Sequence, residues 1–494
     1  MDKKSPKSKK TKWTALVFAI IVMVTIGFLL PPFHGLPVAG QRALGILAFA
    51  VLIWVTEAVT YPVSAAFIIA LLTVLLGLSP SLSGGGGLIG SKTALEWALS
   101  GFSSAATALI AGALFLSAAM QETGLDKRVA LIVLSKVGST VKGILVGVIL
   151  VGIFLAFFIP SPTARVGAMI PIILGMVTAF GLPKNSRLSA LLLLATAHTA
   201  TIWSIGIKTA TPQNMVGLNF IEKAFPYSVS WLQWFLAAAP WSLVMTILLY
   251  LVLLFLVPQE TKVIASGKDV VKKQLQELGR MPFAQIRLFF IAFFALVLWA
   301  TEGSLHPFDS TTIVIILVSL LLAPGIGVLS WSNVEKLIPW GTIILFAAGI
   351  SLGTVLLKTN GAAWLAKIAF QTTDIRSLPI LVIVAILAAF AILLHLGFAS
   401  ATSLAATLIP VAIAFVEGMK DPGTIHGMGI VLITQFAIGF GFILPVNAPQ
   451  NMLAYGTGTF ETKDFIKTGL LLTILGYGLL IVFSFTYWKW VNIL

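Results

Sequence analysis

Two short polar phrases interrupt apolar stretches of the chain, and they contain the residues best suited to hold a charged ligand. Each places a serine two residues before a threonine, Ser161 with Thr163 and Ser400 with Thr402. At the first turn of a helix such hydroxyls can cap the helix, while free backbone N–H groups point into the break. Two helix N-termini that meet would form an anion site without a formal positive charge. The alternative is that the hydroxyls only cap their own helices or bond the carbonyl four residues earlier.

A second pair of phrases contains Pro-Gln-Asn-Met, once after Thr211 and once after Ala448. A helix unwound at such a point exposes carbonyl oxygens that can hold a cation and N–H groups that can meet a carboxylate. The alternative is a proline kink that neighbouring helices compensate. The predicted binding residues of both pairs of phrases are Ser161, Pro162, Thr163, Thr211, Pro212, Ser400, Ala401, Thr402, Asn447, Ala448 and Pro449.

Two basic residues lie in or beside these phrases, where charge is otherwise sparse. Arg165 follows the first serine–threonine pair, and Lys208 opens the first Pro-Gln-Asn break. A basic group inside a membrane is costly and is by default a functional candidate. Because no acidic residue lies within the phrases, we expect a carboxylate ligand to be compensated by Arg165 and Lys208. The alternative, which applies more to Lys208, is snorkelling or pairing with backbone carbonyls.

Three phrases occur twice in the same order and at nearly the same spacing, which implies a duplicated half. The third of them is Trp-x-Thr-Glu, which ends in Glu57 and in Glu302. Polar interruptions at matching places in two halves of a membrane protein point to a binding site between the repeats. For the two glutamates we expect structural roles at helix ends, and for His198 and His395 hydrogen-bonded positions in the core.

Composition identifies the class of protein that must position these residues. Hydrophobic residues make up 58% of the 494, charged residues only 10%, and the mean hydropathy is +1.04. These values indicate a polytopic membrane protein. The net charge of +14 lies in loops and is not interleaved with aromatic residues, which argues against a nucleic-acid partner. The absence of cysteine excludes disulfides and thiolate metal sites.

Apolar runs long enough to cross a bilayer predict an all-α fold of about 11 transmembrane helices. Two further apolar stretches, 140–180 and 378–418, are broken in the middle, and we predict re-entrant hairpins there. Each half then has five crossings and one hairpin; because five is odd, the halves form an inverted repeat. The predicted crossings are 13–31, 40–58, 61–79, 102–120, 187–227, 229–257, 282–301, 311–330, 339–357, 424–465 and 467–490.

Basic residues cluster before the first crossing and in the one long polar linker, which predicts that both lie in the cytoplasm. The C-terminus is then extracellular. From these patterns we predict six segments. They are a basic cytoplasmic N-terminus at 1–12, scaffold helices with the first span at 13–139, a first transport segment at 140–257, a cytoplasmic linker at 258–288, scaffold helices at 289–375, and a second transport segment at 376–494.

Taken together, the repeated phrases resemble the divalent anion:sodium symporter (DASS) family, also called INDY transporters, which carry di- and tricarboxylates. The resemblance spans nearly the whole chain. It implies a transport domain of hairpins and broken helices that slides against a scaffold in a homodimer, an elevator mechanism. The phrases that carry it are Ile159-Pro-Ser-Pro-Thr-Ala-Arg165, Ala399-Ser-Ala-Thr402, Trp-x-Thr-Glu in each half, and the Pro-Gln-Asn segments with Ala454-Tyr-Gly-Thr-Gly458.

The chain departs from the family signature at one position in each half. The family has Ser-Asn-Thr at the tips of both hairpins, where this chain has its serine–threonine pairs. In sodium-coupled members the asparagine helps to ligate Na⁺ and contacts substrate. Here that residue is Pro162 in one half and Ala401 in the other, and neither has a side-chain oxygen for a hard cation. Arg165 and Lys208 could supply the missing positive charge. The chain therefore resembles the dicarboxylate exchanger branch of the family.

The resulting prediction is a sodium-independent antiporter of C4–C5 dicarboxylates such as succinate, malate, fumarate or 2-oxoglutarate. A Na⁺-coupled symporter that uses backbone carbonyls, and an anion channel, remain as alternatives. Enzymatic activity is not expected, because the chain has neither paired acids nor a histidine-rich metal cluster. We expect no cofactor and no metal. The expected partners are the dicarboxylates, the lipid bilayer of the plasma membrane and a second copy of the chain.

Overall fold

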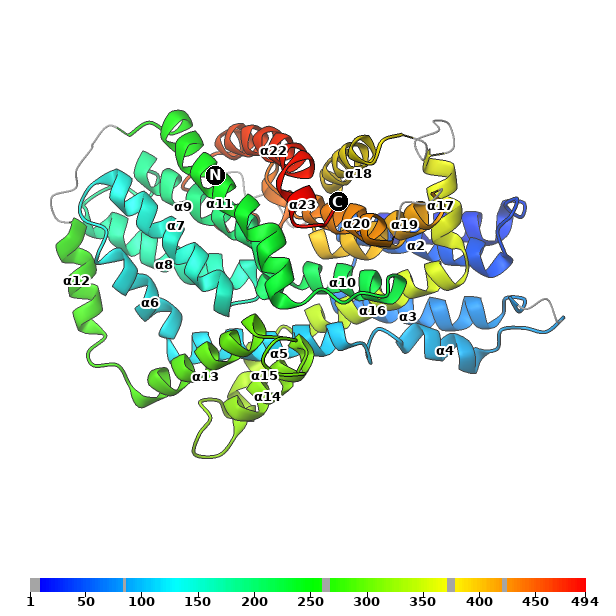
Figure 1. The fold of residues 1–494 in the computed structure, drawn as a ribbon, viewed down its shortest axis with the longest axis horizontal. Helices are drawn as coiled ribbons and strands as arrows, with labels where there is room; N and C mark the ends of the chain where they lie inside the picture. Colours follow the sequence, from blue (N-terminus) through cyan, green and yellow to red (C-terminus); the bar gives the residue numbers. More distant parts are fainter. Residues whose placement is uncertain (1–8, 83–85, 260–266, 371–377, 420–423) are drawn as a thin grey trace.

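The computed structural model describes residues 9–82, 86–259, 267–370, 378–419 and 424–494 (Figure 1). Within these residues the secondary structure is entirely helical, as expected from the sequence. The first eight residues of the predicted basic N-terminus and residues 260–266 of the predicted linker lie outside the described residues.

The first half of the chain contains the long apolar helices, two helical breaks and several short helices. Its elements are α1 (Lys9–Val24), η1 (Thr25–Leu29), α2 (Val38–Thr56), α3 (Tyr61–Gly77), α4 (Ser91–Leu99), α5 (Ala105–Thr123), α6 (Leu125–Leu134), α7 (Val141–Phe158), α8 (Pro162–Ala179), α9 (Arg187–Gly206), η2 (Lys208–Ala210), α10 (Pro212–Ala224) and α11 (Trp231–Leu256). The helix α12 (Gly267–Glu277) follows in the linker.

The second half repeats this order. Its elements are α13 (Phe283–Ala300), α14 (Ser310–Leu322), α15 (Trp331–Leu337), α16 (Trp340–Lys358), α17 (Gly361–Phe370), α18 (Ile380–His395), α19 (Ala401–Glu417), α20 (Thr424–Ile438), η4 (Pro445–Asn447), α21 (Pro449–Tyr455), α22 (Thr462–Phe485) and α23 (Tyr487–Trp490).

Ten helices in the described part of the chain are long and apolar enough to cross a membrane, and five shorter apolar helices accompany them. Every predicted crossing corresponds to a helix or to a broken helix. One crossing is shorter than predicted, because α14 ends at Leu322 instead of near residue 330. The short helices α4, α6, α12, α15 and α17 were not predicted.

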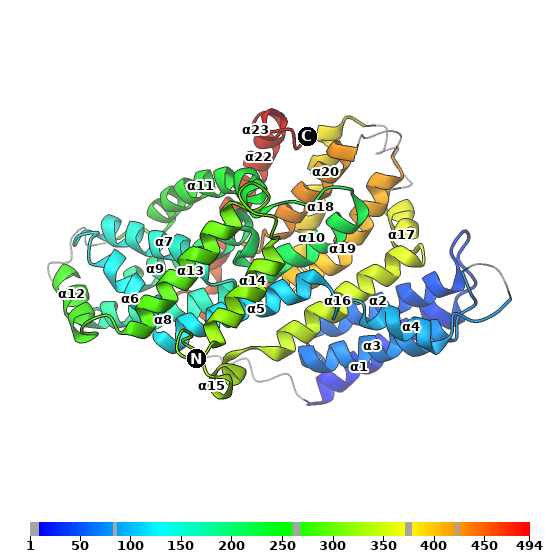
Figure 2. The same ribbon diagram turned by 60° about the horizontal axis from the view of Figure 1, so that its bottom comes forward.

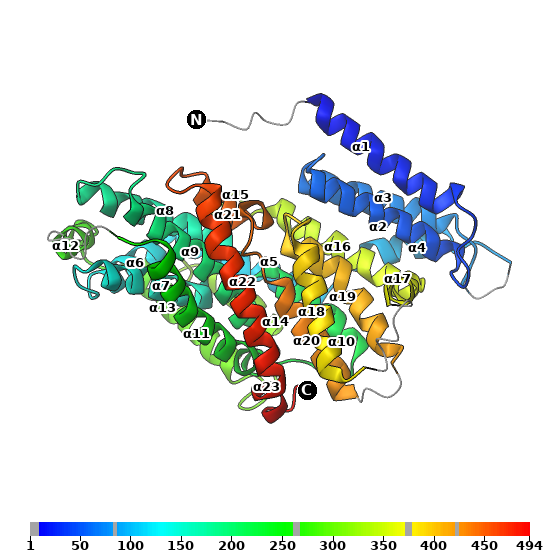
Figure 3. The ribbon, with the colours of Figure 1, turned by 90° about the horizontal axis from the view of Figure 1, so that it is seen from above.

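The two halves interlock through equivalent elements, as an inverted repeat requires. The helix after each Pro-Gln-Asn break packs on the helix that begins at the serine–threonine pair of the other half: α10 on α19, and α21 on α8. Likewise α3 packs on α16, and α14 packs on α5 (Figure 2). The α1 helix lies outside this arrangement, at the outer edge beside α2, and is largely exposed (Figure 3). The breaks of both halves are thereby brought together inside the molecule.

The glycine Gly469 of α22 marks a close approach that fixes the second break. A Cβ added to it would lie 1.9 Å from the carbonyl oxygen of Phe442, which belongs to the unwound segment before η4. No side chain fits at that distance without moving backbone. The helix α22 can therefore support the break only because residue 469 is a glycine.

Contacts with the end of the linker show which helix ends lie on the linker side of the molecule. The Arg128 side chain of α6 is buried and donates to the carbonyls of Leu278 and Gly279 at the end of the linker. Gln285, at the start of α13, donates to the carbonyl of Thr123, the last residue of α5. The C-terminal end of α5 and the N-terminal end of α13 therefore lie on the same side as the linker.

Candidate functional site

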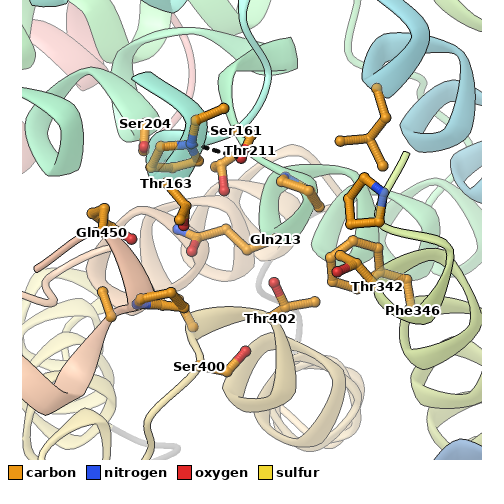
Figure 4. Close-up of a pocket in the computed structure, with 18 of the residues that line it drawn as sticks. Ser161, Thr163, Ser204, Thr211, Gln213, Thr342, Phe346, Ser400, Thr402 and Gln450 are labelled. Atoms are coloured by element: carbon orange, nitrogen blue, oxygen red, sulfur yellow. Dashed lines mark hydrogen bonds between the residues drawn. The ribbon is translucent and has the colours of Figure 1, made fainter. Parts of the chain in front are cut away.

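A cavity of about 440 Å³ lies where the breaks of the two halves meet (Figure 4). Both predicted serine–threonine pairs line it, Ser161 with Thr163 from one half and Ser400 with Thr402 from the other. Their hydroxyl groups converge on the cavity from opposite walls. The spatial arrangement thus joins two phrases that lie far apart in the sequence.

Four helices begin at this cavity. Ser161 and Ser400 are the N-cap residues of α8 and α19, and each hydroxyl accepts a hydrogen bond from the N–H of the third residue of its helix. Thr211 and Ala448 hold the same position before α10 and α21, with φ near −150° at both. The first N–H groups of a helix have no carbonyl partner within it, and the helix dipole is positive at this end. Four such ends at one cavity favour an anionic ligand.

The cavity walls contain hydroxyl, amide and imidazole groups but no carboxylate, lysine or arginine among their lining residues. Seven predicted binding residues remain besides the two serine–threonine pairs, and all of them but Asn447 line the cavity. Those that line the cavity are Pro162, Ala401, Thr211, Pro212, Ala448 and Pro449. With no acidic side chain in the wall, a dianion meets no like charge there.

Arg165 lies directly behind this wall and is almost fully buried, with 1% of its surface exposed. Its Nη1 donates to the carbonyls of Ile159 and Ala210, each at 2.8 Å. Its Nη2 donates to the carbonyl of Ala200 at 3.0 Å and to Ser204 Oγ at 2.9 Å. The guanidinium therefore joins the first tip to the first Pro-Gln-Asn break through oxygen atoms of the kind that would otherwise surround a cation.

Asn447 makes the equivalent link in the second half with a neutral side chain. Its Nδ2 donates to the carbonyl of His395 at 2.7 Å and to that of Phe398 at 3.4 Å. The Nε2 atom of His395 lies 3.2 Å from the carbonyl oxygen of Asn447. His395 was expected only as a core residue, and it is buried, but its side chain also lines the cavity. Asn447, by contrast, braces the wall from behind.

Lys208 does not point into the cavity. Its Nζ donates to the carbonyl of Val229 at 2.6 Å and to Ser310 Oγ at 3.3 Å. Ser310 in turn donates from Oγ to the carboxylate of Glu302 at 2.7 Å. The lysine has polar partners in the protein itself, which is the carbonyl-pairing alternative that the sequence left open.

The glutamates of both Trp-x-Thr-Glu phrases lie at helix ends, and Glu57 is the C-cap residue of α2. Glu302 accepts hydrogen bonds from the backbone N–H of Trp231 and of Ser310, the first residues of α11 and α14. His198 is fully buried and bonds to Thr468 Oγ1 at 3.0 Å, as expected for a core residue. The structural roles predicted for Glu302 and His198 are confirmed by these contacts.

Several lining residues were not predicted from the sequence. Gln213 and Gln450, the middle residues of the repeated Pro-Gln-Asn phrase, both face the cavity. The repetition of the glutamine in both phrases could have indicated this role, but binding was predicted for the neighbouring residues instead. The facing wall comes from helix ends of the other elements, including Tyr61 of α3, Gln121 of α5 and Thr342 of α16.

These scaffold residues show which side of the molecule the cavity faces. Gln121 is exposed and lies at the end of α5 that contacts the start of α13. Asn333 of α15, the short helix before α16, donates to Glu122 of the same end of α5 at 3.0 Å. The cavity is therefore nearest to the side that carries the linker, whereas the Lys208 cluster lies at the start of α11 and α14.

Comparisons with known proteins agree with these features. A family model described as the sodium:sulfate symporter transmembrane region matches residues 10–494. A Cupriavidus necator protein described only as a membrane protein is 43% identical over 476 residues, covering 96% of this chain and 92% of its own. The Staphylococcus saprophyticus sodium-dependent dicarboxylate transporter SdcS is 26% identical over 390 residues, covering 74% of this chain and 73% of its own. The Escherichia coli citrate/succinate antiporter is 25% identical over 490 residues, covering 96% and 97%.

A solved structure shares the fold. The crystal structure of the Alcanivorax borkumensis YdaH transporter superposes with a TM-score of 0.55 at 15% sequence identity. The match covers 86% of this chain and 98% of that one. At this identity the likeness concerns the arrangement of helices.

Proposed function

The chain belongs to the divalent anion:sodium symporter family, and from this membership we propose that it exchanges C4–C5 dicarboxylates across the membrane without sodium. Its relatives include dicarboxylate transporters of both the sodium-dependent and the antiporter kind. The dicarboxylates that fit the proposal are succinate, malate, fumarate and 2-oxoglutarate. Family membership supports transport of a divalent anion, and the cavity supports the choice of substrate and of coupling.

The observation that carries the substrate class is the meeting of four helix N-termini at one cavity without an acidic side chain. In the proposed complex, one carboxylate is held by Ser161, Thr163 and the start of α8. The other is held by Ser400, Thr402 and the start of α19. The starts of α10 and α21 add further N–H donors beside them. Two hydroxyl-lined tips on opposite walls suit a ligand with a carboxylate at each end.

The coupling proposal rests on Arg165. A sodium ion at a helix break needs several oxygen ligands from the tip and from the unwound segment. In the first half the carbonyls of Ile159 and Ala210, one from each, are already bonded to the guanidinium. Pro162 and Ala401 contribute no side-chain oxygen in their place. Because the Arg165 guanidinium is part of the chain, it cannot leave the site, and a sodium gradient cannot drive transport through it.

The transport cycle proposed here is an elevator in a homodimer. The arms around each tip, α7–α8 and α18–α19, act as re-entrant hairpins and move with the broken helices against α2–α5 and α13–α16. We place the protein in the plasma membrane with the N-terminus and linker in the cytoplasm and the C-terminus outside. In that orientation the cavity faces the cytoplasm, since it lies nearest to the side of the linker.

A counterflow experiment in proteoliposomes tests the exchange. We expect labelled succinate to enter only vesicles that contain a dicarboxylate, at the same rate with and without Na⁺. Uptake that needs an inward Na⁺ gradient and proceeds into empty vesicles would refute antiport. It would establish the symporter alternative, which the sodium-dependent relative favours.

Substitution of the two threonines tests the site. Thr163→Ala and Thr402→Ala should each weaken dicarboxylate binding about tenfold to a hundredfold, the effect of one hydrogen bond to a charged group. The matched controls are Thr178→Ala and Thr407→Ala in the same two helices. Their hydroxyls bond only the carbonyl four residues earlier. Unchanged affinity in both cavity variants would disprove the site.

A further inference from the structure

The two glutamines of the Pro-Gln-Asn phrases occupy equivalent positions on the cavity wall. Gln213 and Gln450 are each the second residue of the helix that follows a break, α10 and α21. Both side chains are nearly buried, with 5% and 7% of their surface exposed, and both line the cavity. In Figure 4 the Gln213 amide lies between the levels of Thr163 and Thr402. The amides thus face the middle of the cavity rather than its two ends.

The backbone of Gln213 is held in place from the other half. Gln435 of α20 donates from Nε2 to the carbonyl of Gln213 at 3.1 Å. The side chain of the next residue, Asn214, donates to the carbonyls of Ser204 and Ile207 at the end of α9. These contacts fix the start of α10, so the Gln213 side chain is presented from a rigid position. Its own amide has no protein partner in the part of the chain that the structure describes.

Gln450 is oriented differently. Its Nε2 donates to Thr201 Oγ1 at 3.3 Å, and Thr201 donates in turn to the carbonyl of Ala197 at 3.1 Å. This bond turns the amide nitrogen towards the wall and leaves Oε1 as the group that can accept from a ligand. The pair therefore offers a donor and acceptor from Gln213 and an acceptor from Gln450.

We propose that Gln213 and Gln450 are specificity-determining residues that select dicarboxylates with a hydroxyl group on the carbon chain. A hydroxyl can accept from Gln213 Nε2 and donate to Gln450 Oε1 at the same time. A keto oxygen can only accept, and it uses Gln213 alone. The methylene of an unsubstituted dicarboxylate satisfies neither amide, and an amide that loses water without gaining a partner weakens binding.

This inference rests on the proposed function, because it assumes that the serine–threonine pairs hold the two carboxylates and leave the middle of the ligand to the glutamines. It predicts an order of apparent affinity. L-malate should bind about five to ten times more tightly than succinate, and 2-oxoglutarate more tightly than glutarate by a similar factor. Within each of these pairs the carbon chain has the same length, so only the substituent differs.

The test measures competition against labelled succinate uptake in succinate-loaded proteoliposomes. Gln213→Met should bring the ratio of 2-oxoglutarate to glutarate close to one, because it removes the only donor to the keto group, and it should lower the malate-to-succinate ratio in part. Gln450→Met should lower only the malate-to-succinate ratio, because a keto group does not donate. The control is Gln259→Met, because the Gln259 amide donates to the carbonyls of Arg187 and Val257 outside the cavity lining; it should change neither ratio.

Each ratio is internal to one preparation, so a lower yield of a variant does not alter it. If Gln213→Met does not fold, Gln213→Leu takes its place. The wild-type ratios test the predicted order of affinity even without a folded variant. Wild-type ratios near one, or ratios that persist in both the Gln213 and the Gln450 variant, overturn the inference and leave the proposed function intact. Failure of the wild-type protein to exchange any of the four compounds refutes the proposed function itself.

Discussion

Replacement of Arg165 by methionine is the perturbation that bears most directly on how transport is coupled. Methionine is close to arginine in reach but has no donor and no charge. The substitution frees four oxygen atoms that now accept from the guanidinium, at 2.8 to 3.0 Å. Two of them belong to the tip and to the Pro-Gln-Asn break, which the arginine holds together.

The change in the free energy of unfolding can be estimated from the four hydrogen bonds that Arg165→Met removes. Bonds to a charged donor contribute about 1.5–3 kcal/mol each, so the gross loss is roughly 6–12 kcal/mol. Burial of a guanidinium without a carboxylate partner costs several kcal/mol, and the variant no longer bears that cost. We expect a net destabilisation of about 3–5 kcal/mol, with unfolding of the first tip as the main route. For a chain of 494 residues this corresponds to roughly 3–5 °C in melting temperature.

The expected change in the sodium dependence of transport is more specific to this reasoning than the expected loss of stability. The freed oxygens of Ile159, Ala210, Ala200 and Ser204 form a set that a sodium ion can use. We therefore expect Arg165→Met to lose sodium-independent exchange and to regain part of its uptake when Na⁺ is added. The assay is succinate counterflow with Na⁺ against an equal concentration of choline. A melting curve of the same preparation, with and without Na⁺, should show stabilisation by Na⁺ only in the variant.

Arg42→Met is the matched control. Arg42 of α2 also donates to a backbone carbonyl and to a serine hydroxyl, those of Leu75 and Ser79, each at 3.0 Å, but it lies away from the cavity. Its variant should melt at a lower temperature and keep sodium-independent exchange. The reasoning is refuted if Arg165→Met melts with the wild-type protein and exchanges succinate at the wild-type rate without sodium.

Three further substitutions test the supports of the site. Lys208→Met removes the bonds to Val229 and Ser310 and should lower the melting temperature while leaving the affinity for dicarboxylates within about twofold, as measured by competition. Asn447→Ala removes the brace of the second tip and should slow exchange at least tenfold, with a destabilisation of about 2–3 kcal/mol seen in thermal unfolding. Gly469→Ala forces a Cβ against the carbonyl of Phe442 and should abolish folded protein, as judged by size-exclusion chromatography.

The crossings and the breaks could be predicted because their signals are local. Runs of apolar residues give the long helices, and prolines flanked by hydroxyl residues mark where those helices stop. The short helices could not be predicted in this way. They are neither long nor uniformly apolar, and tertiary contacts hold them, as when Arg128 of α6 enters the end of the linker.

The direction of individual side chains could not be predicted from the sequence. Arg165 and Lys208 have the same kind of sequence context, a basic residue at the edge of a polar phrase. Their partners differ because Ser310, which accepts from Lys208, is brought there by the opposite half of the chain. The glutamines were visible as a repeated letter, but only the phase of α10 and α21 shows that they face the cavity.

The two halves keep the same backbone at their breaks but brace it with different chemistry, and this asymmetry bears on the proposed exchange. Each helix N-terminus contributes about half an elementary charge, so four of them with Arg165 give the empty site roughly +3. A bound dianion reduces that to about +1, which is less costly to carry through the membrane interior. The Asn447 brace adds no charge in the second half. In the proposed exchange the whole positive charge of the site is fixed in the protein, so we expect the ligand alone to determine when the carrier crosses and a gradient of dicarboxylate to drive the cycle.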